Sequence, residues 1–179
     1  MRSLISSVAA VILIALSFGN ASAKANGELG ERSIQEIHSM MVYNFIKYIE
    51  WPAGSSNGEF VIGIIGDDEV FNTMKTWYGG KAVPGGQIIV KNYKNVDEIG
   101  NCQVLYVAAN KSKAFSAIKD KIDGKSTLLV TNRDGLGAKG SCINFKLVNN
   151  KLKFELNKQA VAASKLKVSG RLAEMAIII

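Results

Sequence analysis

The sequence predicts an α/β protein: a layered sheet of about six strands, mainly parallel, with an antiparallel C-terminal hairpin and flanking helices. Nearly continuous apolar runs at 60–65, 102–108 and 127–131 alternate with segments of helical periodicity. This is typical of parallel strands covered on both faces and joined by helices. After residue 142 the pattern changes to strict alternation on both sides of Asn149-Asn150, which predicts a hairpin with one solvated face.

The composition is that of a globular protein and excludes several kinds of site. The chain has 179 residues, 47% hydrophobic and 21% charged, and its net charge of +7 favours anionic partners. It has two cysteines and one histidine, whereas a Cys/His zinc site needs about four ligands. These counts exclude most metal and nucleophile chemistries that need several such residues. We expect no metal, no cofactor, no catalytic residues and no nucleic-acid partner.

Residues 1–23 have the pattern of a cleavable signal peptide. Arg2 precedes an apolar run over 8–18, and the small residues 21–23 (ASA) follow. The run has about 11 residues, whereas a bilayer span needs roughly 20. We expect a flexible lead-in over 24–32 and a single domain over 33–179. The expected location is the periplasm, without direct membrane insertion.

The first helix is predicted from Ser33, whose spacing to Glu36 is that of a capping box, to about Glu50. Pro52 disfavours helical geometry at Trp51 and so ends the helix.

Three polar or aromatic residues of this region are given structural interpretations. Asn44 shares the apolar face of the helix, where a buried amide needs hydrogen-bond partners. Trp51 and Pro52 anchor the end of the helix, with stacking of a ligand on Trp51 as the alternative. His38 lies off the apolar stripe and is expected to face solvent.

The remaining elements follow from local signals. Asp67 or Asp68 can cap a helix that runs toward Trp77. Asn157 can cap a helix that runs through about Leu166, and Ser169 can cap a last helix at the apolar end of the chain. A further strand is expected at 87–90 and a further helix at 114–122.

A ligand pocket is conceivable beyond the carboxyl ends of the parallel strands, where open α/β sheets bind ligands. Gly66 follows the first buried strand, and Asn132 and Arg133 open the glycine-punctuated loop 132–141. The simpler interpretations are a helix cap at 66–68 and a flexible loop at 132–141.

The two cysteines, Cys102 and Cys142, begin different strands. If the strand at 127–131 lies between them, their Cα atoms are about 10 Å apart, beyond disulfide reach. We expect two buried free thiols, although a bridge closing this loop would stabilise the fold by roughly 4 kcal/mol.

An ordered set of motifs resembles the YfiR family. The run YNFIKYIEWP at 43–52 resembles the family's opening signature, followed by FVIGIIG at 60–66, the strand at 102–107, GSCINF at 140–145, FELN at 154–157 and LKVSGRLAEMA at 166–176.

The resemblance implies a periplasmic α/β regulator without known catalysis. The family's namesake is a dimer that binds the periplasmic sensor part of an inner-membrane diguanylate cyclase and holds it inactive. Here the matching partner-binding residues would be Lys158, Gln159, Lys165 and Leu166.

The resemblance also bears on the cysteines. Family members can carry one disulfide between the first and middle strands and another across the hairpin. In this sequence Gly63 stands at the partner position on the first strand and the hairpin has no second cysteine, so Cys102 and Cys142 each look like half of a lost pair.

The function expected from these observations is repression of the sensor domain of an inner-membrane signalling protein, a diguanylate cyclase in the cyclic-di-GMP pathway, by a homodimer. A small-molecule-binding protein without a cyclase partner is the alternative, and an extracytoplasmic enzyme is a third class. Repression requires strong discrimination between two partner states, which exposed lysines alone do not supply, so we expect an apolar surface beside the basic one.

Overall fold

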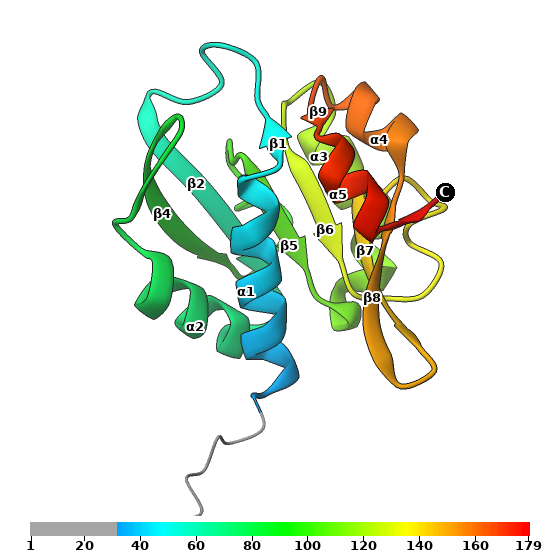
Figure 1. Cartoon of the computed structure of the whole chain (residues 1–179). Helices are drawn as coiled ribbons and strands as arrows, with labels where there is room; N and C mark the ends of the chain where they lie inside the picture. The colour runs from blue at the N-terminus through cyan, green and yellow to red at the C-terminus, as the bar shows by residue number, and fades with distance from the viewer. Residues whose placement is uncertain (1–31) are drawn as a thin grey trace, which may run out of the picture. The chain divides into compact units, whose positions relative to one another are not determined.

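The computed structural model describes residues 32–179. Its central element is a mainly parallel sheet (Figure 1). The predicted signal peptide and all but the last residue of the lead-in lie outside this range. The described elements are α1 (Ile34–Ile46), β1 (Ile49–Glu50), β2 (Gly58–Ile65), α2 (Asp68–Tyr78), β3 (Ala82–Val83), β4 (Gly86–Tyr93), β5 (Val104–Val107), the 3₁₀ helix η1 (Ala109–Ala114), α3 (Phe115–Ile122), β6 (Leu128–Thr131), β7 (Ile143–Val148), β8 (Lys151–Leu156), α4 (Lys158–Ala163), β9 (Lys167–Val168), α5 (Gly170–Met175) and β10 (Ile177–Ile178).

The sheet confirms the predicted fold class. Its order is β10-β8-β7-β6-β5-β2-β4-β3, and β1 pairs with β9 in a separate two-stranded sheet. The β4-β2-β5-β6-β7 pairs are all parallel, whereas β7 and β8 form the antiparallel hairpin. The two short strands β3 and β10 bring the main sheet to eight, against the six predicted, because two-residue pairings leave no periodic signal in a sequence.

Helices cover both faces of the sheet (Figure 1). All four residues of β5 and all four of β6 are buried, as expected for strands with helices on each side. On one face His38 of α1 contacts Tyr106 and Phe145. α3 lies against the opposite face, where Leu129 and Cys142 point.

The N-terminal helix starts as predicted and ends earlier. The Ser33–Glu36 capping box is present, with both hydrogen bonds at 3.1 Å. The helix ends at Ile46 and not near Glu50, because the chain turns there and Ile49–Glu50 pairs with β9. Pairing with a distant strand ends the helix before Pro52 can act.

Two predictions about side chains of α1 are wrong. Asn44 is exposed and accepts a hydrogen bond from Lys47 Nζ at 3.0 Å, so it does not tie the helix to a neighbouring loop. His38, predicted to face solvent, is only 5% exposed. The hairpin supplies the cover for His38, since Phe145 of β7 stacks on its ring at 4.3 Å.

The C-terminal region follows the predicted turn and cap signals closely. Asn149 and Asn150 have φ of 50° and 57°, the left-handed values that a two-residue hairpin turn requires. Asn157 and Ser169 cap α4 and α5 through their side chains. The prediction that the chain ends in a helix is wrong for its last residues, because Ile177–Ile178 form β10, which pairs in parallel with β8.

No helix among residues 32–179 has both the length and the apolar character needed to cross a membrane.

Candidate functional site

The C-terminal surface, which we define as the exposed side chains of residues 158–179, combines cations with apolar groups. Lys158, Gln159 and Lys165, the predicted partner contacts, are all exposed. Lys165 has φ of 57°, so the chain turns sharply after α4 and presents this side chain at the turn. The fourth predicted contact, Leu166, is 4% exposed and packs in the core, so its side chain is not part of this surface.

The apolar part of the C-terminal surface comes from α5 and β10. Met175 is 53% exposed and Ile178 45% exposed, and Ile179 is also exposed. These three are among the five large hydrophobic side chains that are exposed in residues 32–179. Exposed apolar side chains are typical of protein-binding surfaces where they form a contiguous patch, and these three occur within one short segment of the chain.

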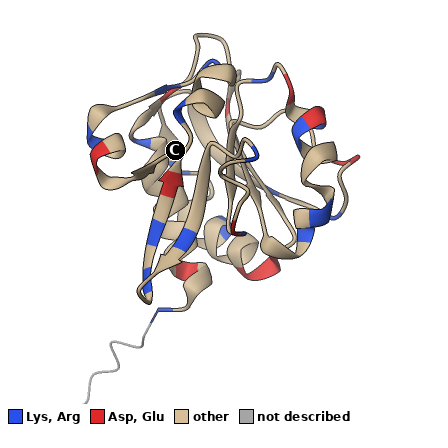
Figure 2. Cartoon of the chain, turned by 90° about the vertical axis from the view of Figure 1, so that its right-hand side faces the viewer, with Lys and Arg blue, Asp and Glu red and all other residues tan. Residues whose placement is uncertain are grey.

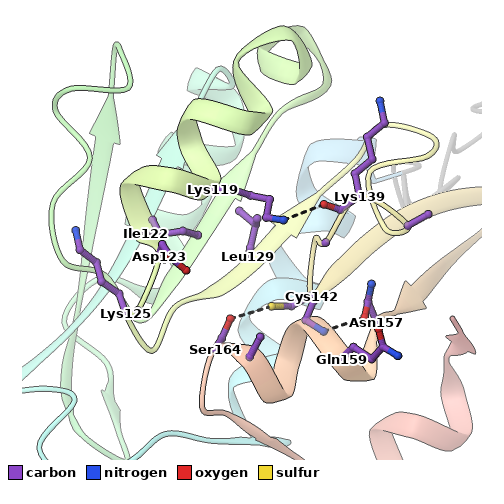
Figure 3. Close-up of a pocket in the computed structure, with 15 residues that line it drawn as sticks. Lys119, Ile122, Asp123, Lys125, Leu129, Lys139, Cys142, Asn157, Gln159 and Ser164 are labelled. Carbon is purple, nitrogen blue, oxygen red and sulfur yellow. Dashed lines mark hydrogen bonds between the residues drawn. The ribbon is translucent and has the colours of Figure 1, made fainter.

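A pocket of about 410 Å³ opens beside α4, between α3, the loop 132–141 and α4 itself (Figure 3). Three lysines line it, and one of them, Lys119, donates from Nζ to the Lys139 carbonyl at 3.1 Å. Lys125 and Lys139 direct their amino groups away from the cavity, toward solvent (Figure 3). Gln159 lines the same pocket, so a partner on α4 would also cover its mouth.

Asn157 joins this pocket to the helix. Its Oδ1 accepts from the Ala160 N–H at 2.9 Å, and its Nδ2 donates to the Gly137 carbonyl at 2.9 Å. The predicted cap is confirmed, and the second bond fixes α4 to the loop 132–141.

The β7–β8 hairpin adds a basic strip next to a buried carboxylate, and Figure 2 shows the blue segments along both strands. Lys146 and Lys153 are directly opposite each other, and Lys146 Nζ lies 3.1 Å from Glu155 Oε1. Glu155 is buried and accepts from Asn144 Nδ2 at 2.9 Å. The hydrogen bond and charge of Glu155 raise the pKa of Lys146, which is therefore held as a cation.

The predicted ligand-pocket residues do not share one site. Gly66 has φ of 92°, and its carbonyl accepts from Asn110 Nδ2 at 2.8 Å. A side chain at position 66 would collide with Asn110 and Lys111, which fill the space beyond β2. Asn132 and Arg133 instead line a separate pocket together with His38.

Both cysteines are free and buried, as predicted. β6 lies between β5 and β7, the order from which the free thiols were expected. Burial raises the pKa of Cys102 to about 12 and also raises that of Cys142. A Cβ at Gly63 would lie 2.5 Å from the Tyr93 ring, so an aromatic side chain fills the space that a residue at this position would need.

Trp51 is held by packing and by one hydrogen bond. Its Nε1 donates to the Gln103 carbonyl at 3.2 Å and its ring meets Phe60 edge-on at 4.9 Å. Gln103 is itself buried and accepts from the Val61 N–H at 2.6 Å. The sequence gives no periodic signal for this glutamine, yet it connects the segment after α1 to the central strands.

Among residues 32–179 no group of three His, Cys, Asp or Glu side chains is placed to hold a metal ion. The only histidine is the buried His38, whose Nδ1 lies 3.0 Å from Tyr106 Oη. Burial lowers the pKa of His38 to about 4, which leaves the ring neutral at pH 7.

The comparisons with known proteins agree with this fold. A comparison with curated proteins gives no match. Among solved structures, the crystal structure of a conserved domain protein from Vibrio cholerae O1 biovar El Tor superposes with a TM-score of 0.57 at 9% identity. The match covers 83% of this chain and 60% of that one, and at this identity it shows the fold alone.

The family comparison covers most of the described residues. A family model described as YfiR/HmsC-like matches residues 35–177, from the first turn of α1 to the first residue of β10. The match includes each motif from which the resemblance was drawn, and the chain therefore belongs to the YfiR/HmsC-like family.

Proposed function

We propose that this protein is a periplasmic regulator in the cyclic-di-GMP pathway, which binds the sensor domain of an inner-membrane signalling protein and holds it inactive. The observation that carries the proposal is the family match over residues 35–177, since the family is regulatory and not catalytic. The partner is a diguanylate cyclase, the protein acts as a homodimer, and it has no catalytic activity of its own.

Repression by binding requires a difference in affinity between two states of the partner. Moving a partner from 1:99 to 99:1 in favour of the inactive state takes about 5.5 kcal/mol of discrimination. Exposed lysines contribute only about 0–1 kcal/mol each. The exposed Met175 and Ile178 offer apolar area that can supply the remainder, in the same C-terminal segment as Lys158 and Lys165.

The test is capture of the partner from solubilised host membranes with the tagged mature protein. We expect recovery of an inner-membrane protein with a periplasmic sensor domain and a cytoplasmic cyclase domain. The double variant Lys158→Glu/Lys165→Glu should lose this protein. Lys113→Glu, a matched change at an exposed lysine of η1, should retain it.

Two outcomes would contradict the proposal. If both variants captured the membrane protein equally well, the C-terminal surface would not be part of the interface. Recovery of no membrane protein by a folded sample would favour the alternative function, binding of a small molecule without a cyclase partner, for which the pocket shared by Asn132 and Arg133 is the supporting observation.

A further inference from the structure

A second pocket, which we call the His38 pocket, lies at the carboxyl ends of β5 and β6. Its volume is about 510 Å³. The start of α1 and the tip of the β7–β8 hairpin lie at this same end of the sheet (Figure 1). Side chains from α1, the loop after β6 and the hairpin line it, among them Ile34, His38, Arg133, Phe145, Leu147 and Leu152.

The inner end of the pocket is an imidazole held in one orientation. Stacking on Phe145 at 4.3 Å, with 10° between the ring planes, and the 3.0 Å contact from Nδ1 to Tyr106 Oη fix the ring. The second ring nitrogen, Nε2, has no hydrogen-bond partner in residues 32–179. Two other polar side-chain atoms in this range, Tyr93 Oη and Asn132 Oδ1, are unpaired and fully buried. His38 thus lines the pocket with one ring nitrogen, Nε2, that has no protein partner among the described residues.

The walls of the pocket are aliphatic and unusually exposed. Leu147 is 67% exposed and Ile34 is 42% exposed, the two large exposed hydrophobic side chains of the described chain that lie outside the C-terminal surface. Leu152 is directly opposite Leu147 in the hairpin and completes this wall. Side chains from two elements far apart in the chain thus present hydrocarbon to one cavity, which an apolar ligand would cover.

Three charged side chains line the pocket: Arg133, Asp134 and Lys146. Arg133 is exposed and makes no ion pair within residues 32–179. Lys146 is already paired with Glu155, so Arg133 is the lining cation that remains free to bind an anion. His38 adds no charge because burial keeps it neutral at pH 7. A single guanidinium binds a carboxylate in a bidentate way and matches the single charge of a monocarboxylate.

We propose that the His38 pocket binds a small monocarboxylate with an aliphatic body, the carboxylate on Arg133 and the hydrocarbon against Ile34, Leu147 and Leu152. This inference does not rest on the repressor function, because it concerns the protein without a partner.

Octanoate is the probe, and the binding is measured by calorimetry on the purified protein. We expect saturable binding, with acetate at least roughly a hundredfold weaker because it lacks the hydrocarbon, and with 1-octanol weaker because it lacks the charge. Arg133→Gln should weaken octanoate roughly tenfold, and Leu147→Ser severalfold. Both residues are exposed, so neither change should unfold the protein.

The controls are matched in chemistry and lie outside the pocket. Lys139→Gln removes a cation from the same loop, and Met175→Ser removes an exposed hydrophobe of α5; both should leave octanoate binding unchanged. Because His38 is the only histidine, its ring signals in NMR report the pocket directly, and octanoate should shift them. Unchanged His38 signals, or binding that Arg133→Gln does not weaken, would overturn the proposal, as would no binding at millimolar octanoate.

Discussion

Trp51 shows how one side chain can join the end of a helix to the centre of a sheet. Its indole N–H bonds the Gln103 carbonyl and its ring packs edge-on against Phe60. We expect Trp51→Ala to lower the free energy of unfolding by about 2–4 kcal/mol, since both the hydrogen bond and a large apolar contact are lost. Urea denaturation followed by far-UV circular dichroism measures this change.

The matched control is the second tryptophan. Trp77 contacts Tyr78 edge-on at 6.2 Å and lies outside the core cluster and the side chains packed on it, so Trp77→Ala should cost about 1 kcal/mol or less. If Trp51→Ala kept the wild-type denaturation midpoint and abolished partner binding, Trp51 would be a contact residue and not a structural one.

His38 makes the stability of the protein depend on pH. Burial lowers its pKa in the folded state to about 4, below the value of about 6.5 expected when unfolded. The folded state therefore binds the proton less readily, and its stability is complete above pH 6.5 and declines as the pH falls toward 4. Between pH 7 and pH 5 we expect a loss of about 2 kcal/mol from this group.

The measurement is urea unfolding at pH 7 and pH 5 for the wild type and for His38→Gln. The variant should lack most of the pH-dependent loss, since it has no histidine left to titrate. Should the variant fail to fold, NMR titration of the single histidine ring in the wild type replaces it. A midpoint near 6.5 in the folded protein would contradict the expected behaviour.

At the scale of the element, α4 depends on its cap. It has six residues, too few for helix propensity alone to maintain, and Asn157 supplies both the cap and the bond to Gly137. Asn157→Ala should cost about 1–2 kcal/mol and speed hydrogen exchange in α4. Asn157→Asp keeps an acceptor for the Ala160 N–H and loses the bond to Gly137. Its stability and its hydrogen exchange in α4 should therefore lie between those of the wild type and of Asn157→Ala. Equal exchange in all three proteins would contradict this role.

The elements that the sequence predicts best are those set by local chemistry. The capping box at Ser33 and the caps at Asn157 and Ser169 occur where expected, as does the Asn149-Asn150 turn, because each depends on residues within one turn of itself. The end of α1 and the strand β10 are different. Both depend on pairing with a strand that is distant in sequence, which periodicity does not report.

The site shows the same division. Lys158, Gln159 and Lys165 are exposed as expected, whereas Leu166 is buried. His38 was missed as a pocket residue because its cover, Phe145, comes from the far end of the chain. In an isolated helix the His38 ring would lie at the boundary of the polar face. In the folded protein the β7–β8 hairpin covers the ring and buries it.

At the scale of the whole molecule, cations and apolar groups of the C-terminal surface should affect binding in different ways. The net charge of +7 and the exposed Lys158 and Lys165 favour approach to an acidic partner face. Exposed charges act mainly on association, and buried apolar contacts act mainly on dissociation. Raising the salt from about 0.05 M to about 0.5 M should therefore slow association roughly tenfold and change dissociation little.

Surface plasmon resonance with the captured partner separates the two contributions. Lys158→Gln/Lys165→Gln should slow association at low salt and flatten its salt dependence, while Met175→Ser should speed dissociation and leave the salt dependence as it is. Lys113→Gln serves as the control for the loss of positive charge at a distant exposed site. An association rate that does not respond to salt would mean that the partner binds the protein elsewhere, because an interface between exposed lysines and an acidic face is weakened by salt screening.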